Sequence, residues 1–148
     1  MNTAGKLVEL KGVDTQDGIA LAWLTKAGID TGVISGRTSD GFRERAKMLK
    51  MKYIIQGALD KIPPFERILR QSRLRPDQIA YVGDDLPDLP VLKRVGWAAA
   101  PANARPEVRS AVHFVSRAKG GSGAIREIAE ILLKAQGLWK GIVDEYSA

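Results

Sequence analysis

The chain has 148 residues, of which 45% are hydrophobic and 27% charged, and this is the composition of a single soluble globular domain. It has no cysteine and one histidine, which excludes disulfides, thiolate metal sites and histidine-rich zinc sites, so any bound metal must be held by oxygen. The net charge of +6 favours an anionic small molecule over nucleic acid, because the basic residues are scattered along helical stretches without interleaved aromatic residues, and no apolar run approaches the ~20 residues of a membrane span.

Helices and strands alternate along the chain from about residue 16. Apolar residues at helical spacing predict a helix over 19–27, which Gly28 ends. Short apolar runs after it predict strands, and the amphipathic or proline-started segments between them predict helices. The further predicted elements are, in chain order, a strand at 31–35, a helix at 39–50, a strand at 53–56, a helix at 63–72, a strand at 79–82, a helix at 89–94, a strand at 96–100, a helix at 105–111, a strand at 113–115 and a helix at 124–135.

This alternation, with its short connections, predicts a three-layer, Rossmann-like parallel sheet with helices on both faces. The chain has no internal repeat and no interdomain linker, so one domain is expected over 1–148, with a core at 14–137 and a C-terminal tail at 138–148. Ligands of such sheets bind in the crevice beyond the carboxyl ends of the strands. The residues that follow each predicted strand are therefore the first candidates for a site.

Polar residues follow three successive predicted strands at the point where each strand ends. They are Ser35, Gly36 and Arg37 after the first strand, Lys61 after the second, and Asp84, Asp85 and Asp88 after the third. Each group alone is commonly a turn, a solvated lysine or a helix cap. Together at one edge they supply the donors and positive charge that a phosphate needs, and carboxylates whose mutual repulsion calls for a hard cation. The sequence thus predicts a magnesium and phosphate site.

The order of these motifs resembles the haloacid dehalogenase superfamily of phosphatases. The motifs are Ser-Gly-Arg-x-Ser at 35–39, Gln-Gly-x-x-x-Lys at 56–61, Gly-Asp-Asp-x-x-Asp-Leu at 83–89 and Gly-Gly-x-Gly-Ala-x-Arg-Glu at 120–127. More narrowly, the chain is similar to the small capless enzymes that hydrolyse 3-deoxy-D-manno-octulosonate 8-phosphate in lipopolysaccharide synthesis. The resemblance runs from about Gly5 to Leu133, and the segments 98–104 and 120–127 narrow it beyond the superfamily.

The resemblance implies a role for each candidate residue. It implies that Ser35 and the Gly36 amide bind the transferring phosphoryl group, that Lys61 neutralises it, that Arg37 contacts the anionic sugar phosphate, that Asp84 ligates Mg²⁺ directly, and that Asp85 and Asp88 support the metal. It also implies a haloacid dehalogenase-like fold with no cap domain. Residues 1–13 would be the second half of a projecting β-hairpin, which in the family helps to assemble a homotetramer.

The chain departs from the family at the nucleophile. The superfamily uses an aspartate nucleophile and an aspartate general acid/base. Both lie in an Asp-x-Asp-Gly motif at the end of a central strand, and no such motif occurs here. Asp17-Gly18 is no relic of it, because Thr15 stands where the first aspartate would be. Without that strand, backbone groups of the sheet would lack partners unless Leu7–Leu10 takes its place.

Two accounts of this departure stay open. In the first, Met1 is an internal methionine, and about 20 further residues carry the strand and both aspartates. In the second, the chain is a non-catalytic domain that serves assembly. The intact acidic cluster favours the first, because such a cluster is costly to keep without a cation. A nucleotide-binding or receiver domain is disfavoured, since the Gly-x-Gly-x-x-Gly and Walker signatures are absent. The expectation is therefore a cytoplasmic, magnesium-dependent sugar-phosphate phosphatase.

Overall fold

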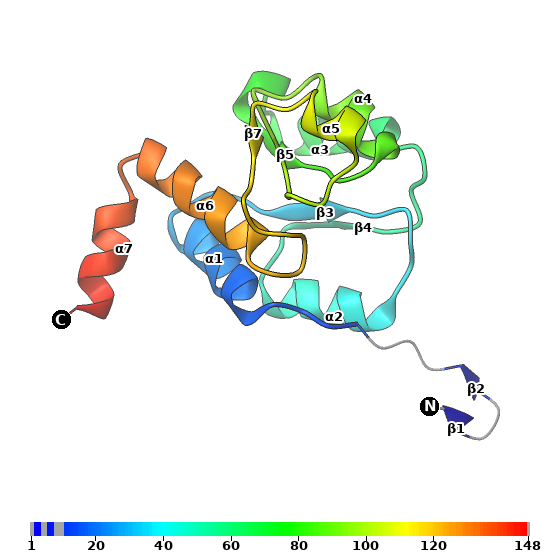
Figure 1. Cartoon of the computed structure of the whole chain (residues 1–148), viewed down its shortest axis with the longest axis horizontal. Coiled ribbons are helices and arrows are strands. Elements are labelled where there is room, and N and C mark those ends of the chain that lie inside the picture. The colour runs from blue at the N-terminus through cyan, green and yellow to red at the C-terminus, as the bar shows by residue number, and fades with distance from the viewer. Residues whose placement is uncertain (1, 4–5, 8–10, 148) are drawn as a thin grey trace.

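The computed structural model describes residues 2–3, 6–7 and 11–147 (Figure 1). Its helices are α1 (Thr15–Lys26), α2 (Asp40–Met48), α3 (Ile62–Ser72), α4 (Leu89–Leu92), α5 (Pro106–Arg109), α6 (Ala124–Ala135) and α7 (Trp139–Tyr146). Its strands are β1 (Asn2–Thr3), β2 (Lys6–Leu7), β3 (Gly32–Ile34), β4 (Tyr53–Ile55), β5 (Ala80–Val82), β6 (Trp97–Ala100) and β7 (Phe114–Val115). The alternating order of helices and strands predicted from the sequence is confirmed, with most elements a few residues shorter than predicted.

Local capping decides where the first helices begin. The Asp14 carboxylate accepts hydrogen bonds from the backbone amides of Gln16 and Asp17, at 2.7 and 3.1 Å, so α1 begins at Thr15, earlier than its apolar repeat predicted. Ser39 caps α2 in the same way, with its hydroxyl accepting from the Phe42 amide at 3.4 Å. These caps satisfy amides that have no partner within their own helix.

The parallel sheet is divided into two parts. β3 pairs with β4, and β5, β6 and β7 pair in that order, every pair being parallel. Among the described residues no ladder joins β3 to β5, so each of these strands keeps one edge without a strand partner. β1 and β2 form a separate antiparallel pair. Of the segment Leu7–Leu10, which was considered for the central position, residues 8–10 lie outside the described part.

Helices cover both sides of the strands. In Figure 1, α2 lies on one side of β3 and β4, while α3, α4 and α5 lie on the other. The larger core forms between these last helices and the strands, around the buried side chains of Phe65, Leu92 and Val108. β6 contributes the fully buried alanines 98–100, whose small side chains let helices approach the sheet closely. The predicted α/β fold class is thus confirmed.

A second core joins the two ends of the chain. α1 and α6 lie side by side and α7 folds back against them (Figure 1). Trp23 contacts Trp139 edge to face, with ring centroids 5.5 Å apart, and its indole N–H donates to the Tyr146 hydroxyl at 3.1 Å. The tail predicted at 138–148 therefore contains a helix that packs on its own domain. In the described part of the chain, no helix is both long and apolar enough to cross a membrane.

Candidate phosphate and metal site

The segment after β3 forms a tight turn that is tied to the end of β4. The Ser35 amide donates to the Ile55 carbonyl at 2.9 Å, which extends the ladder, and the Ala58 amide donates back to the Ser35 carbonyl at 2.9 Å. The Arg37 amide donates to the Ser35 hydroxyl at 3.1 Å. A Cβ at Gly36 would lie 3.2 Å from the Leu59 side chain, so the turn sits closely against the segment that follows β4. The carboxyl ends of these two strands thus present one rigid polar edge.

Lys61 reaches from the start of α3 to the acidic loop after β5. Its Nζ lies 2.5 Å from Oδ1 of Asp88, and the two side chains are 14% and 4% exposed. Because α3 follows β4, whereas Asp88 follows β5, this ion pair joins the two separate sheets at their carboxyl edge. The structure therefore brings Lys61 and Asp88 together, as the strand-end argument predicted.

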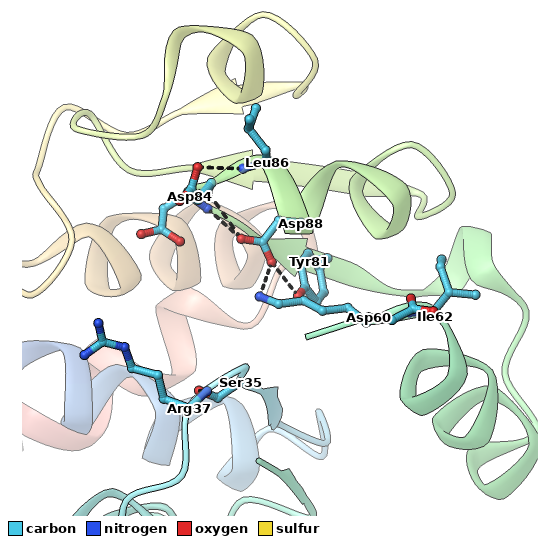
Figure 2. Close-up of polar contacts among 10 residues, drawn as sticks. Ser35, Arg37, Asp60, Ile62, Tyr81, Asp84, Leu86 and Asp88 are labelled. Atoms are coloured by element: carbon cyan, nitrogen blue, oxygen red, sulfur yellow. Dashed lines mark hydrogen bonds and ion pairs between the residues drawn. The ribbon is translucent and has the colours of Figure 1, made fainter. Parts of the chain in front are cut away.

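The Asp88 carboxylate is saturated with hydrogen-bond donors. Oδ1 accepts from Lys61 and from the Tyr81 hydroxyl, the latter at 2.8 Å, and Oδ2 accepts from the backbone amides of Asp84 and Asp85 at 3.1 and 3.3 Å (Figure 2). A carboxylate offers about four lone-pair positions, and these donors fill them. Asp88 is thus a clamp between the lysine and the acidic loop, and it has no oxygen to spare for direct metal ligation.

The other two carboxylates of the loop differ in how they are engaged. Asp85 caps the turn Leu86–Asp88, its carboxylate accepting from the Leu86 amide at 2.8 Å. No side chain in the described ranges donates to the Asp84 carboxylate, while the Asp84 carbonyl accepts from the Arg105 amide at 2.9 Å. The backbone of Asp84 is therefore fixed on both sides, and its charged group is left available.

Charge repulsion within the loop acts on Asp84. Burial raises the pKa of Asp84, and the nearby charge of Asp88 raises it further. For Asp88, burial also acts to raise the pKa, but the hydrogen bonds from Lys61 and Tyr81 outweigh it, so its pKa lies below the usual range. Asp88 is thus held ionised beside an acid that is harder to ionise, which a bound cation would relieve.

The three carboxylates predicted for the metal site, Asp84 as the direct ligand with Asp85 and Asp88 in support, do not form a shared ligand group. Among the described residues, no group of three or more acidic or histidine side chains is placed to hold a metal ion. The reason is that Asp88 is turned toward Lys61, and Asp85 toward its own helical turn. The donor set that remains, the hard carboxylate oxygens of Asp84, suits Mg²⁺, which keeps several water ligands and often takes only one or two protein carboxylates.

Ser35 and Arg37 lie across from this loop. Figure 2 shows both side chains on the β3 side, with Asp84 and Asp88 on the β5 side. Arg37 is exposed, and no carboxylate in the described ranges pairs with it. A phosphorylated ligand between these two sides would meet a hydroxyl and a guanidinium on one face and Lys61 on the other.

One contact within the site and one helix cap elsewhere were not found from the sequence. Tyr81 is part of a predicted strand, and nothing in its local pattern indicates that its hydroxyl binds Asp88. Asp17, the acid considered as a relic of a catalytic motif, accepts from the amides of Gly123 and Arg126 at 3.3 and 2.8 Å. It therefore caps α6, a role that depends on the packing of α6 beside α1.

The glycine-rich motif at 120–127 forms the entry to α6. Gly121 and Gly123 have φ of 72° and 95°, a region in which glycine is favoured. The Glu127 carboxylate accepts from the Ser116 hydroxyl at 2.6 Å and from the Arg117 amide at 2.8 Å, which holds the loop closed behind the motif. The motif thus shapes a loop next to β7, and none of its side chains joins the Lys61–Asp88 network.

Comparison with known proteins places these features in a family. Residues 51–128 match the family model described as haloacid dehalogenase-like hydrolase, which covers Lys61 and the whole acidic loop. A curated relative from Yersinia pestis, the 3-deoxy-D-manno-octulosonate 8-phosphate phosphatase KdsC, is 38% identical over 133 residues, which are 90% of this chain and 71% of that protein.

Solved structures agree with the sequence matches. A probable YrbI family phosphatase from Pseudomonas syringae superimposes with a TM-score of 0.94 at 40% identity, covering 99% of this chain and 86% of that chain. A 3-deoxy-D-manno-octulosonate 8-phosphate phosphatase from Moraxella catarrhalis, in complex with a magnesium ion, a phosphate ion and a KDO molecule, superimposes with a TM-score of 0.91 at 32% identity. That match covers 96% of this chain and 85% of the Moraxella chain.

Proposed function

The chain belongs to the haloacid dehalogenase-like hydrolases, with phosphatases as its relatives, and we propose that it hydrolyses 3-deoxy-D-manno-octulosonate 8-phosphate with Mg²⁺ as cofactor. The observation that carries the proposal is the Lys61–Asp88 ion pair, which holds the lysine ammonium against an acidic loop at the carboxyl edge of the strands. That edge is where ligands of parallel α/β sheets bind. The relatives named for this sugar phosphate supply the substrate class.

In the proposed site, Ser35 and Lys61 bind the phosphoryl group. The Ser35 hydroxyl and the Gly36 amide donate hydrogen bonds to its oxygens, and the Lys61 ammonium offsets the charge that develops during transfer. The rigid turn after β3 and the clamp on Lys61 fix these groups before substrate arrives, and such pre-organisation lowers the barrier more than flexible donors do.

The metal is assigned to Asp84. In the described structure its carboxylate neither accepts a hydrogen bond from a side chain, as that of Asp88 does, nor caps the following turn, as that of Asp85 does, and its donor chemistry fits Mg²⁺. Bound there, the metal would polarise a phosphoryl oxygen and help to neutralise its charge. Asp85 and Asp88 then support the site indirectly, Asp85 through the turn that it caps and Asp88 through the amides that it accepts.

Arg37 is assigned to the acid group of the sugar. The proposed substrate carries a carboxylate as well as a phosphate, and a planar guanidinium can bind a carboxylate with two parallel hydrogen bonds. Arg37 lies two residues beyond Ser35 on the same turn, exposed and opposite the acidic loop (Figure 2). The net charge of +6 also favours approach of a doubly anionic substrate.

The nucleophile is assigned to a strand that is not among the 148 residues. No Asp-x-Asp-Gly motif occurs in them, and β3 and β5 each keep an edge without a strand partner in the described structure. A strand parallel to both would pair with both edges and end beside Ser35 and Asp84. The proposal further places the enzyme in the cytoplasm, in lipopolysaccharide synthesis, and as a homotetramer.

The test is a phosphate-release assay on two forms of the protein. The 148-residue chain and a form extended upstream in its native reading frame are assayed with the octulosonate phosphate and Mg²⁺. Turnover is expected from the extended form, with loss on EDTA treatment and in an Asp84→Asn variant. Asp60→Asn, an exposed acid that caps α3 outside the acidic loop, is the control and should retain activity. If neither form turns over substrate while both assemble into the same oligomer, the proposal is wrong and the chain is better interpreted as a non-catalytic assembly domain.

A further inference from the structure

Tyr81 lies on β5 and donates its hydroxyl to the oxygen that also binds Lys61. The Tyr81 hydroxyl is 2.8 Å from Oδ1 of Asp88, and Lys61 Nζ is 2.5 Å from the same atom (Figure 2). The contact spans seven residues from a strand to a buried turn, and Asp88 is 2% exposed. No role in the phosphate or metal chemistry described above requires this hydroxyl.

The hydroxyl decides which direction is open to the lysine. An oxygen of a carboxylate has two lone-pair positions, and Tyr81 fills one on Oδ1, so Lys61 is confined to the other. The carboxylate cannot rotate, because its other oxygen, Oδ2, accepts hydrogen bonds from the amides of Asp84 and Asp85. The lysine side chain is a flexible stem with a rotatable ammonium, so its position depends on such partners.

We propose that Tyr81 is a positioning residue: its hydroxyl confines Lys61 to the side of Asp88 that faces the phosphoryl position. The inference rests on the proposed function for the identity of the anion, but the geometry of the clamp does not. Without the hydroxyl, the Lys61 ammonium can donate to either lone-pair position of Asp88 Oδ1, so it shifts toward the space that the hydroxyl leaves. The positive charge then lies farther from a bound phosphate.

A matched pair of variants separates this effect from loss of packing. Tyr81→Phe keeps the ring against the core and removes only the hydroxyl. Tyr53→Phe removes the buried hydroxyl of a tyrosine on β4 that forms no hydrogen bond with Lys61 or Asp88 in the described structure, so it is the control. Both are made in the 148-residue chain.

The first measurement is the NMR signal of the Lys61 side-chain ammonium, assigned by its loss in Lys61→Arg. We expect the signal to move in Tyr81→Phe and to stay in place in Tyr53→Phe. This readout needs no ligand. An unchanged signal in Tyr81→Phe overturns the proposal, whatever the protein binds.

The second measurement is the affinity for vanadate, a phosphate analogue, in the presence of Mg²⁺. We expect Tyr81→Phe to weaken binding about tenfold, which corresponds to about 1.4 kcal/mol, and Tyr53→Phe to leave it unchanged. In a Lys61→Ala background the Tyr81→Phe effect should vanish, because the hydroxyl acts through the lysine. An equal loss with and without Lys61 overturns the proposal. A moved ammonium signal with no vanadate binding by any form supports the positioning and contradicts the proposed function.

Discussion

The buried clamp predicts that Asp88→Asn is strongly destabilising even without ligand. Aspartate accepts from four donors here, those of Lys61, Tyr81 and the amides of Asp84 and Asp85. Asparagine has the same shape but only one acceptor oxygen, and its amide hydrogens would face two of the four donors in either orientation. The Lys61 ammonium, 14% exposed, would also lose its ionic partner.

The magnitude follows from the burial of the pair. Removing one partner of a buried ion pair costs about 3–5 kcal/mol, and because Lys61 keeps some exposure we expect the lower end, about 3 kcal/mol. For a chain of this size that lowers Tm by about 6–12 °C. The assay is urea unfolding at pH 7 followed by tryptophan fluorescence, with the free energy of unfolding taken from the midpoint and slope.

The control is Asp85→Asn, in the same loop. Asp85 is exposed and its carboxylate caps a short turn, a role that asparagine fills nearly as well, so its cost should stay below about 0.5 kcal/mol. If Asp88→Asn costs no more than Asp85→Asn, the saturated clamp does not stabilise the loop and the reasoning from hydrogen-bond saturation is refuted.

Three further outcomes follow from the same structure. Mg²⁺ affinity, measured by calorimetry, should fall as the pH drops toward the pKa of Asp84, which burial and the charge of a neighbouring acid raise. The Asp84→Asn variant should bind Mg²⁺ at least tenfold more weakly than the original chain, with no loss of stability in EDTA. The hydrogen bond from a serine hydroxyl lowers the pKa of Glu127 from 4.5 to about 2, so the stabilisation that the ionised Glu127 contributes is present above pH 4.5 and lost as the pH falls toward 2. Glu127→Gln should therefore lower the free energy of unfolding by about 1 kcal/mol at pH 7. In urea unfolding, this difference from the original chain should shrink between pH 4.5 and 2. Gly96→Ala should destabilise the protein by more than about 2 kcal/mol in thermal melts, because the new Cβ would lie 2.0 Å from the Asp77 carbonyl oxygen. Gly141→Ala, in α7 with open space around the new Cβ, should stabilise the protein by about 0.5–1 kcal/mol. An equal effect of the two substitutions would contradict the packing argument.

The sequence by itself predicted the features that depend on neighbours along the chain. The alternation of helices and strands, the end of α1 at Gly28 and the family motifs are all short-range patterns. Because parallel strands place their carboxyl ends at one edge, the sequence also predicted that Lys61 would lie near the acidic loop. It further predicted, from the missing Asp-x-Asp-Gly motif, that the sheet would lack a central strand.

Only the tertiary structure decided what each charged group does. Lys61 and Asp88 are 27 residues apart and Trp23 and Tyr146 are 123 apart, so their contacts depend on how separate elements pack. Three aspartates in five positions look alike in sequence, yet a buried lysine, a tyrosine and two backbone amides saturate one of them, whereas no side chain in the described ranges donates to another. The physical reason is that burial and hydrogen-bond donors, rather than residue type, fix the charge that a carboxylate can offer.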